Sequence, residues 1–493
     1  MKIERALSDA QETRRPAVLP WLVVLFLGSL ALGLWFLIRP AFGAAPYYRV
    51  GWRQNTYEYY RQILALFVPY ALALFAWSRG GRVSLWVVLG GALVLHLVVL
   101  FAPPPQSQDL YQYLFYGKMQ AAHGANPYVV PPIALHADSW YPWIRWFDQT
   151  SVYGPVWMLL SLGVVKASGG DLPLAVVLFK LVVLALDVGI MAMIVSAARG
   201  RPEHTDSAGW GLLAYAWNPL ILISVPLAGT ADVALAAAIL GGYLTRRRGQ
   251  MAATTVLLTV ATLIKPYAAV GLLLHLALLA RDRKGRTVLT HAAGAVGIAA
   301  IAYTPYWAGW NTLNGLYRAV SLTNQSVTGT LQRLVVVPIV AVFRGHPATP
   351  TAQVVVRAVA GALLLWSIVW AVRRARQTGD MWQPLLFVTV AYLYLTPWFL
   401  YWYMVVPLVL VAALPRSRLT LPILTFSAST FFLVVFNPPA MNLLVLVLVR
   451  FGPPLLVFLL QPYAFRRGWG SEGPVSVRIP ATVATTREAS PAQ

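Results

Sequence analysis

The chain contains no cysteine, and only 16 of its 493 residues are acidic. The lack of cysteine excludes disulfides, thiol nucleophiles and thiolate metal sites. Charged residues make up only 11% of the chain and hydrophobic residues 58%, and the mean hydropathy is +0.65. This composition excludes an ordinary soluble enzyme and indicates a protein that lies in a lipid bilayer.

Long apolar runs recur along the chain, each of about the 20 residues that a helix needs to cross the hydrocarbon. They lie at 18–38, 83–102, 172–198, 287–303, 354–372 and 419–436, and several other runs are shorter or broken by proline. The first run is too long for the core of a signal peptide, so we expect it to be retained. The sequence predicts an all-α polytopic membrane protein with about 14 transmembrane helices.

The formal charge of +22 comes from short clusters of arginine and lysine between the apolar runs rather than from one basic face. Such clusters mark cytoplasmic loops. The positive charge is therefore better explained by membrane topology than by nucleic-acid binding. They leave two large outward loops, 103–171 and 307–350. Treating 153–165 as a crossing would place every later cluster outside, so we expect an interfacial helix there, and likewise at 331–343.

The same reasoning sets the domain organisation. Residues 1–17 form a predicted cytoplasmic tail, 18–462 a single transmembrane domain, and 463–493 a second cytoplasmic tail. The second tail is rich in Pro, Ser and Thr and is predicted to be disordered. We expect a multi-pass protein of the cytoplasmic membrane with both termini inside.

A catalytic base has few candidates, because most acidic residues fall in the predicted inside loops. Asp109 and Asp232 each lie where a predicted span meets the outer boundary. Asp109 either caps the helix "LYQYLFYGKMQAA" that follows it or acts as a base, and both readings stay open here. Asp232 in "GTAD" likewise either caps a helix or contributes to a substrate site. Lys180 and Asp187, seven residues apart on one predicted helix, are expected to satisfy each other.

Several polar and aromatic groups share the predicted outer surface. Lys265 in "LIKPY" opposes the positive-inside trend, so it either snorkels or holds an anion such as a phosphate. Asn218 beside Pro219 is expected to mark a packed kink within a span. The outer loop at 307–350 adds Arg318, Asn324, Gln325 and Arg333, and "WFLYWY" adds Trp398, Tyr401 and Trp402. These last three aromatic residues form either an interfacial belt or a platform for a sugar ring.

The motifs "QDLYQYLFYGKMQAAHGANPY", "YGPVW", "WNPLIL", "GTAD", "LIKPY", "NQSVTGTLQR" and "WFLYWY" occur in this order over roughly residues 80–410. In order and sidedness the chain resembles the GT-C fold glycosyltransferases, most closely the bacterial polyprenyl-phosphate-mannose-dependent mannosyltransferases. The resemblance implies a large outward first loop with interfacial helices and an outward catalytic base, which corresponds to Asp109. It also implies basic groups for the donor phosphate, which correspond to Lys265 and Arg333, with Arg318 as a further candidate.

Where relatives carry an Asp-x-Asp pair for a divalent metal, this chain has Ser107 and Tyr111, so no metal or other cofactor is expected. Sugar-binding roles are assigned to Asn126, Tyr128, Asp232, Asn324, Gln325, Trp398, Tyr401 and Trp402.

The resemblance implies an inverting glycosyltransferase that moves a sugar from a polyprenyl-phosphate donor to a glycan or glycolipid acceptor outside the cytoplasmic membrane. Mannose is the sugar implied, but the same charged residues would suit a donor that carries arabinose or glucose. The alternative is a transporter or flippase for a lipid-linked saccharide. Transporters place ionisable groups near the bilayer midplane and are often built from repeats. The scarcity of such groups and the lack of an internal repeat favour the transferase.

Overall fold

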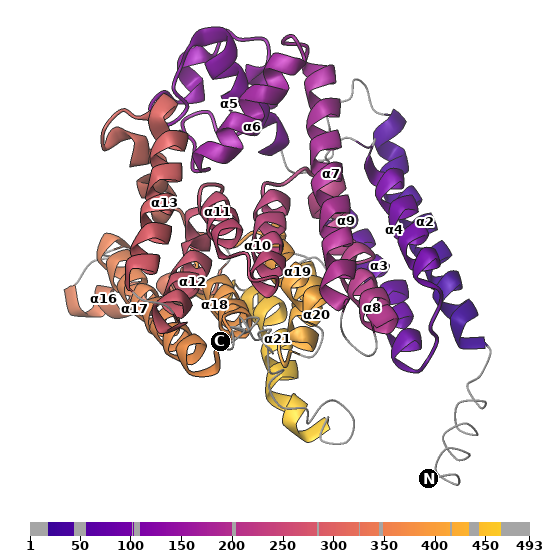
Figure 1. Cartoon of the computed structure of the whole chain (residues 1–493). Helices are drawn as coiled ribbons and strands as arrows, with labels where there is room; N and C mark the ends of the chain where they lie inside the picture. The colour runs from indigo at the N-terminus through magenta and orange to yellow at the C-terminus, as the bar shows by residue number, and fades with distance from the viewer. Residues whose placement is uncertain are drawn as a thin grey trace, which may run out of the picture.

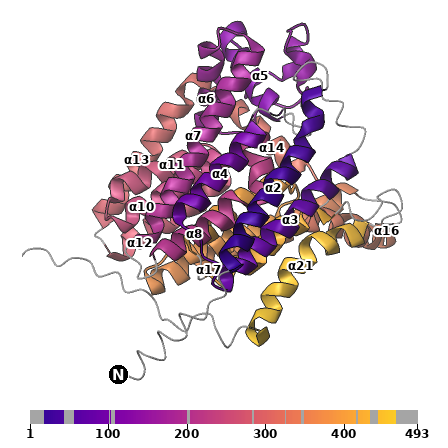
Figure 2. The same cartoon turned by 90° about the vertical axis from the view of Figure 1, so that its right-hand side faces the viewer.

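The computed structural model describes residues 18–43, 56–100, 102, 109–199, 204–282, 285–324, 326–344, 349–414, 417–432 and 443–464. In this part of the chain all regular structure is helical, apart from one bridge between Ala308 and Trp310. Figure 1 shows the helices packed as a bundle, and the view turned by 90° in Figure 2 agrees. The predicted all-α class is confirmed.

Six helices are long and apolar enough to cross a membrane, or seven spans if a bent pair is counted as one more. The six are α2 (Val18–Gly43), α3 (Thr56–Ser78), α7 (Leu172–Ala198), α13 (Gly285–Tyr303), α17 (Thr349–Thr378) and α21 (Leu443–Ala464). The predicted total of about 14 crossings therefore stays a prediction.

Shorter helices fill the bundle between these six. They include α4 (Leu85–Leu100), α8 (His204–Ala216), α10 (Asp232–Arg247), α11 (Met251–Thr262), α12 (Ala269–Asp282), α18 (Trp382–Leu395), α19 (Val405–Ala413) and α20 (Thr420–Ser429). The predicted outer loop around 307–350 contains α14 (Asn314–Ser321), α15 (Val327–Leu331), the π-helix η8 (Gln332–Val336) and α16 (Val337–Arg344). Helix α16 is too short to cross a bilayer.

Helices α5 (Asp109–His123) and α6 (Pro155–Ala167) lie together over one end of the bundle (Figures 1 and 2). Their backbones come close at Gly117, where an added Cβ would lie 2.5 Å from the carbonyl oxygen of Ser161. With 13 residues, α6 is shorter than a membrane span requires. The two helices and the loop between them form the structure that we call the cap, residues 109–167.

The predicted kink at Asn218 is confirmed. Helix α8 and the segment from α9 (Pro219–Leu222) to the π-helix η4 (Ile223–Leu227) meet at an angle of 53°. The Asn218 side chain accepts a hydrogen bond from the Leu220 amide at 2.9 Å and donates one to Ser427 Oγ at 3.0 Å. These bonds satisfy backbone and side-chain groups that would otherwise lack hydrogen-bond partners at the break between the helices.

The predicted contact between Lys180 and Asp187 is wrong. The Lys180 ammonium donates to the backbone carbonyls of Leu100 and Ala102. Asp187 instead pairs with His96 Nε2 at 2.8 Å and accepts a hydrogen bond from the Tyr215 hydroxyl at 2.7 Å. Seven residues rise about 10 Å along a helix. Lys180 and Asp187 are therefore farther from each other than from their partners on neighbouring segments.

Candidate active site

Asp109 is the first residue of α5 and of the cap. Its carboxylate oxygen Oδ1 accepts a hydrogen bond from the indole Nε1 of Trp146 at 3.4 Å. Burial raises the pKa of Asp109 to about 6, although the Trp146 hydrogen bond and the positive charge of Lys265 act against this rise. A carboxylate with a pKa near 6 is ionised at neutral pH and is a stronger base than an exposed aspartate.

Lys265 and Asp232 form a buried ion pair beside Asp109. Lys265 Nζ lies 2.7 Å from Asp232 Oδ2, and the Asp232 side chain is only 1% exposed. The other oxygen, Asp232 Oδ1, makes no hydrogen bond within the described residues. The Lys265 ammonium also lies 4.6 Å from the ring centre of Tyr403 and 5.8 Å from that of Tyr153. Aromatic faces of this kind stabilise a cation without neutralising it.

A tight turn brings Asp232 next to α5. Gly229 has a φ of +68°, and a Cβ added to it would lie 2.9 Å from a methyl carbon of Leu110. The positive φ and the short approach both favour glycine. The turn that precedes α10 therefore packs against the residue that follows Asp109, and the two carboxylates interact electrostatically.

A second glycine joins the cap to the turn that carries Lys265. The Gly154 amide donates to the carbonyl of Ile264 at 2.9 Å, and the Val156 amide donates to the carbonyl of Leu263 at 3.2 Å. A Cβ on Gly154 would lie 2.0 Å from the Leu263 carbonyl oxygen. The segment "YGPVW" therefore docks directly on "LIKPY", two motifs that are far apart in the sequence.

Two other predicted outward acids, Asp138 and Asp171, make structural contacts. Asp138 pairs with Lys118 and His123, each at 2.8 Å. Burial acts to raise the pKa of Asp138, but hydrogen bonds from Lys118 and His123 outweigh it and hold the pKa below the usual range. Asp171 caps α7 by accepting a hydrogen bond from the Leu174 amide at 2.8 Å. Asp109 and Asp232 instead interact with Lys265.

Four residues at the site were not among the predicted site residues. Trp146 binds Asp109, Arg145 attracts it electrostatically, and Tyr153 and Tyr403 flank Lys265. Tyr153 and Tyr403 stand in the motifs "YGPVW" and "WFLYWY", where their position could have indicated a role. Arg145 and Trp146 lie in "WIRWF", which carries no pattern that separates them from an interfacial belt.

Three residues predicted to bind sugar hydroxyls make hydrogen bonds within the protein. Asn126 donates to the carbonyl of Tyr306 at 2.8 Å, and the Tyr128 hydroxyl donates to the carbonyl of Tyr153 at 2.7 Å. Asn324 donates to the carbonyl of Phe399 at 2.6 Å and accepts from its amide at 3.0 Å. These contacts fix the loops around the site, and a direct role in substrate binding stays a prediction for all three residues.

The predicted aromatic platform lies partly beside the catalytic candidate. The rings of Trp398 and Trp146 meet edge to face with their centres 5.9 Å apart. Tyr401 packs on Trp402 at 4.8 Å in η9 (Tyr401–Met404), and its hydroxyl interacts electrostatically with Asp109. The structure therefore places Trp398 and Tyr401 near Asp109, whereas Trp402 is mostly buried.

The remaining predicted ligands are Arg333 and Arg318 for the donor phosphate and Gln325 for the sugar. Arg333 is exposed in η8, and no hydrogen bond within the described residues joins it to Asp109, Asp232 or Lys265. The backbone of Arg318 lies in α14, and its side chain is not among the described groups. Gln325 lies outside the described residues. Their predicted roles stay predictions.

Comparison with known proteins identifies the chemistry. The family described as Alpha-(1->6)-mannopyranosyltransferase, N-terminal domain, matches residues 21–281, a range that includes Asp109, Asp232 and Lys265. Alpha-(1->6)-mannopyranosyltransferase A of Mycobacterium tuberculosis (strain ATCC 25618 / H37Rv) is 26% identical over 373 residues, which cover 69% of this chain and 67% of that protein. No solved structure matches the chain.

The fold and these matches together define a mannosyltransferase, a hexosyltransferase with helices suited to span a membrane. The resemblance found in the sequence is confirmed. The chain belongs to the alpha-(1->6)-mannopyranosyltransferase family.

Proposed function

We propose that this protein transfers mannose from a polyprenyl-phosphate donor to a glycan or glycolipid acceptor at the outer face of the cytoplasmic membrane. One observation carries the proposal: Asp109 lies beside the Lys265–Asp232 pair at the end of the bundle covered by the cap. A base and a cation at a membrane boundary suit a donor whose sugar phosphate is in water and whose chain is in lipid.

In the proposed mechanism, Asp109 acts as the general base. The acceptor hydroxyl oxygen attacks the anomeric carbon and gives its proton to the Asp109 carboxylate. The bond between the anomeric carbon and the phosphate oxygen breaks, and its electron pair leaves with the phosphate. Attack from the face opposite the leaving group inverts the anomeric configuration. Because phosphate leaves without protonation, no second carboxylate is needed as an acid, unlike in glycoside hydrolases.

Lys265 stabilises the charge that grows on the departing phosphate. One of its three N–H groups is directed to Asp232, so the others can meet phosphate oxygens. The rings of Tyr403 and Tyr153 contact the Lys265 cation without adding a second negative charge. Trp398 and Tyr401 offer ring faces to the mannosyl unit, and no metal ion takes part.

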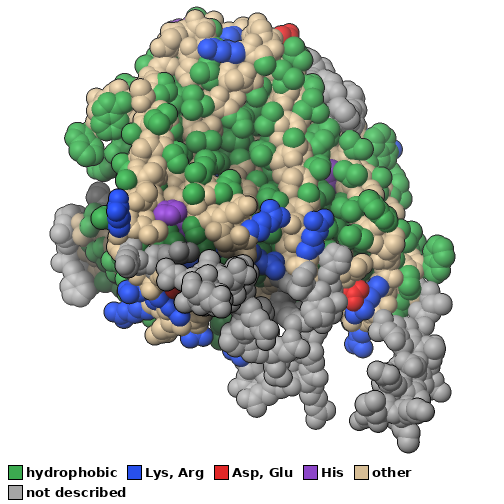
Figure 3. Space-filling view, in the orientation of Figure 1, with side chains coloured by type: hydrophobic (Ala, Val, Ile, Leu, Met, Phe, Trp, Pro, Cys, Tyr) green, Lys and Arg blue, Asp and Glu red, His purple; other side chains and the backbone are tan. Residues whose placement is uncertain are grey.

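The distribution of charge supports an outward site. On the face shown in Figure 3, Lys and Arg gather towards the end away from α5 and α6, with a smaller group at the cap. Cytoplasmic loops carry the excess of positive charge in membrane proteins. The cap and Asp109 then lie on the outer side, and both termini are proposed to lie inside.

A transfer assay with purified protein in liposomes tests the proposed donor. Labelled mannose should reach a mannose-containing acceptor from polyprenyl-phosphate mannose, and no transfer should occur from a nucleotide-linked mannose. Transfer from the nucleotide sugar alone would overturn the proposed donor while leaving the protein a mannosyltransferase.

The pH dependence of transfer should report the ionisation of Asp109. Its pKa of about 6 lies above the usual aspartate value, so the base form is lost at a higher pH than usual. We expect kcat/KM to be independent of pH above neutral pH and to fall about tenfold per pH unit below about pH 6. A profile that stays level down to pH 4 would contradict a general base with this pKa.

Trp146→Phe should move this profile. The indole hydrogen bond lowers the pKa of Asp109, so its loss should raise the midpoint of the kcat/KM profile by roughly half a pH unit or more. Trp398→Phe is the matched control, because Trp398 touches the Trp146 ring and leaves the bond to Asp109 in place. Equal midpoints for the two variants would argue against the Trp146 contact.

A further inference from the structure

Tyr153 stands in the cap directly before the backbone contacts that join the cap to the turn of Lys265. Its carbonyl accepts a hydrogen bond from the Tyr128 hydroxyl at 2.7 Å, and the amide of the next residue, Gly154, donates to Ile264 at 2.9 Å. The Lys265 ammonium lies over the Tyr153 ring, 5.8 Å from its centre. Backbone and ring contacts thus hold Tyr153 against the segment that carries Lys265.

The Tyr153 hydroxyl ends a short chain of hydrogen bonds. The amide of Ala231, which precedes Asp232, donates to the Tyr113 hydroxyl, and the Tyr113 hydroxyl donates to the Tyr153 hydroxyl at 3.2 Å. Because a hydroxyl carries one proton, the Tyr113 proton is used in this contact and the Tyr153 proton is still available. Among the residues that the structure describes, no group accepts it. Accepting a hydrogen bond also polarises the Tyr153 hydroxyl and makes it a better donor.

Tyr153 also borders both carboxylates of the site. It interacts electrostatically with Asp109 and with Asp232. Tyr153 is partly exposed, whereas its hydrogen-bond partner Tyr113 is only 1% exposed. The available proton therefore belongs to the tyrosine that a ligand can reach, beside Lys265 and the two carboxylates.

A neutral hydrogen-bond donor suits a phosphate at this place. A second ammonium or guanidinium group here would attract Asp109 and lower its pKa, which would weaken the base. A tyrosine hydroxyl offers a proton to a phosphate oxygen without adding charge. During transfer the phosphate gains one negative charge and the sugar hydroxyls gain none, so a bond to the phosphate strengthens as the reaction proceeds.

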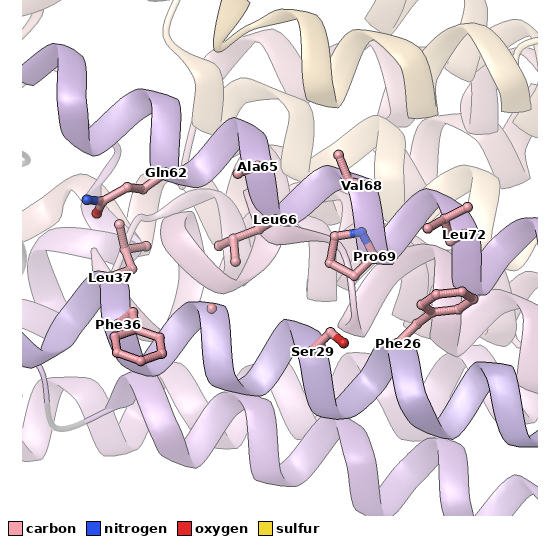
Figure 4. Close-up of a pocket in the computed structure, with 11 residues that line it drawn as sticks. Phe26, Ser29, Phe36, Leu37, Gln62, Ala65, Leu66, Val68, Pro69 and Leu72 are labelled. Atoms are coloured by element: carbon pink, nitrogen blue, oxygen red, sulfur yellow. The ribbon is translucent and has the colours of Figure 1, made fainter.

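The groove drawn in Figure 4 does not offer such a place. It has a volume of about 560 Å³, lies between α2 and α3, and is lined by no charged side chain. Ser29 and Gln62 are its polar lining residues. Without a cation it gives a phosphate no strong partner, unlike the space beside Lys265 and Tyr153.

We propose that the Tyr153 hydroxyl donates a hydrogen bond to a phosphate oxygen of the lipid-linked donor, next to the contact from Lys265, an inference that rests on the proposed function. When the bond between the anomeric carbon and the phosphate oxygen breaks, its electron pair stays on the phosphate. Tyr153 keeps its proton and stabilises this charge, while Asp109 takes the proton of the acceptor hydroxyl. Tyr153 is thus a catalytic residue that acts on the leaving group.

Tyr153→Phe tests this role in transfer. The variant keeps the ring beside Lys265 and loses the hydroxyl, so kcat/KM for the donor should fall by about 10- to 100-fold, the effect of one hydrogen bond to a charged group. The midpoint of the pH profile should not move, because the Trp146 hydrogen bond to Asp109 is intact. A midpoint that rises would assign the Tyr153 proton to Asp109 and overturn the phosphate contact.

Inhibition by polyprenyl phosphate, the product without the sugar, tests the contact in the absence of chemistry. Its inhibition constant against the donor should rise by about tenfold or more in Tyr153→Phe, because the free phosphate carries the full charge that the hydroxyl stabilises. Equal inhibition constants for the variant and the wild-type protein would place the hydroxyl on the sugar or the acceptor, and would overturn the proposal.

Tyr116→Phe is the matched control. Tyr116 is another tyrosine of the cap, and its hydroxyl already has an acceptor in the fold, the carbonyl of Gln149 at 2.8 Å. This control should keep wild-type kcat/KM and the wild-type inhibition constant, with a melting temperature at or slightly below that of the wild-type protein. Equal losses of kcat/KM in the two variants would mean that Tyr153→Phe acts through the packing of the cap.

The outcomes separate this proposal from the proposed function. Wild-type kcat/KM and inhibition by polyprenyl phosphate in Tyr153→Phe would overturn the Tyr153 contact alone. Lack of transfer from polyprenyl-phosphate mannose by the wild-type protein would overturn the proposed donor itself, whatever the variants show.

Discussion

Asp109→Asn is expected to lower kcat for mannosyl transfer by about 10²- to 10⁴-fold, the contribution of a positioned general base. Asparagine keeps an oxygen that can accept the Trp146 hydrogen bond, but it cannot take the proton of the acceptor hydroxyl. The donor KM should change little, because the phosphate contact is assigned to Lys265. Transfer assays in liposomes, with the melting temperature measured alongside, would separate lost chemistry from lost folding.

Asp171→Asn is the matched control for a capping role. Asp171 also lies at a helix start, at the beginning of α7, where it accepts a hydrogen bond from the Leu174 amide. This control should keep wild-type transfer and nearly the wild-type melting temperature, because Asn and Asp are about equally good N-caps. If Asp109→Asn behaved in the same way, Asp109 would serve only to cap helix α5, and the catalytic base would lie elsewhere.

Lys265→Met should have the second largest effect, through both stability and donor binding. Removing the ammonium leaves the buried Asp232 carboxylate unpaired, which typically destabilises a protein by about 3–5 kcal/mol. Apart from stability, the donor KM should rise by about tenfold or more, since a charge-assisted phosphate contact is lost. The acceptor KM should change less, because the acceptor carries no phosphate at the reacting end.

The double variant Lys265→Met with Asp232→Asn separates these two roles. Removing both charges should restore most of the stability, because a buried pair can often be replaced by neutral groups at little cost. The donor KM should stay high, since the phosphate still lacks its cation. Recovery of the donor KM together with stability would mean that Lys265 serves only to neutralise Asp232.

The helical class and the positions of the main elements could be predicted because apolar runs and proline breaks are local signals. The run at 172–198 coincides with α7, and the expected short helix at 153–165 appears as α6, Pro155–Ala167. The number of crossings could not be settled in this way. Helices such as α11 and α18 have only 12 and 14 residues, so length alone does not decide whether they cross a bilayer.

At the site, the sequence indicated the charged residues but not the packing contacts that bring them together. Asp109, Asp232 and Lys265 stood out because each is a charged group at the predicted end of a span, where charges are few. Their convergence depends on Gly229 and Gly154, whose packing against Leu110 and Leu263 has no local signature.

Contacts between distant segments explain the remaining errors. Trp146 reaches Asp109 from a loop 37 residues away, and His96 reaches Asp187 from another helix. Helical periodicity relates residues on the same helix only, which is why Lys180 was wrongly paired with Asp187. Asn126 and Asn324 also hold backbone groups of distant segments, which the sequence did not indicate, and their predicted sugar contacts stay predictions.

A structure of the full-length protein with bound polyprenyl-phosphate mannose, determined with Asp109→Asn to prevent turnover, tests the central claim most directly. The shared-site mechanism predicts phosphate oxygens within hydrogen-bond distance of Lys265 Nζ. It also predicts that residue 109 faces the side of the anomeric carbon opposite the phosphate. A donor phosphate bound away from Lys265, or a sugar that residue 109 cannot approach, would contradict it.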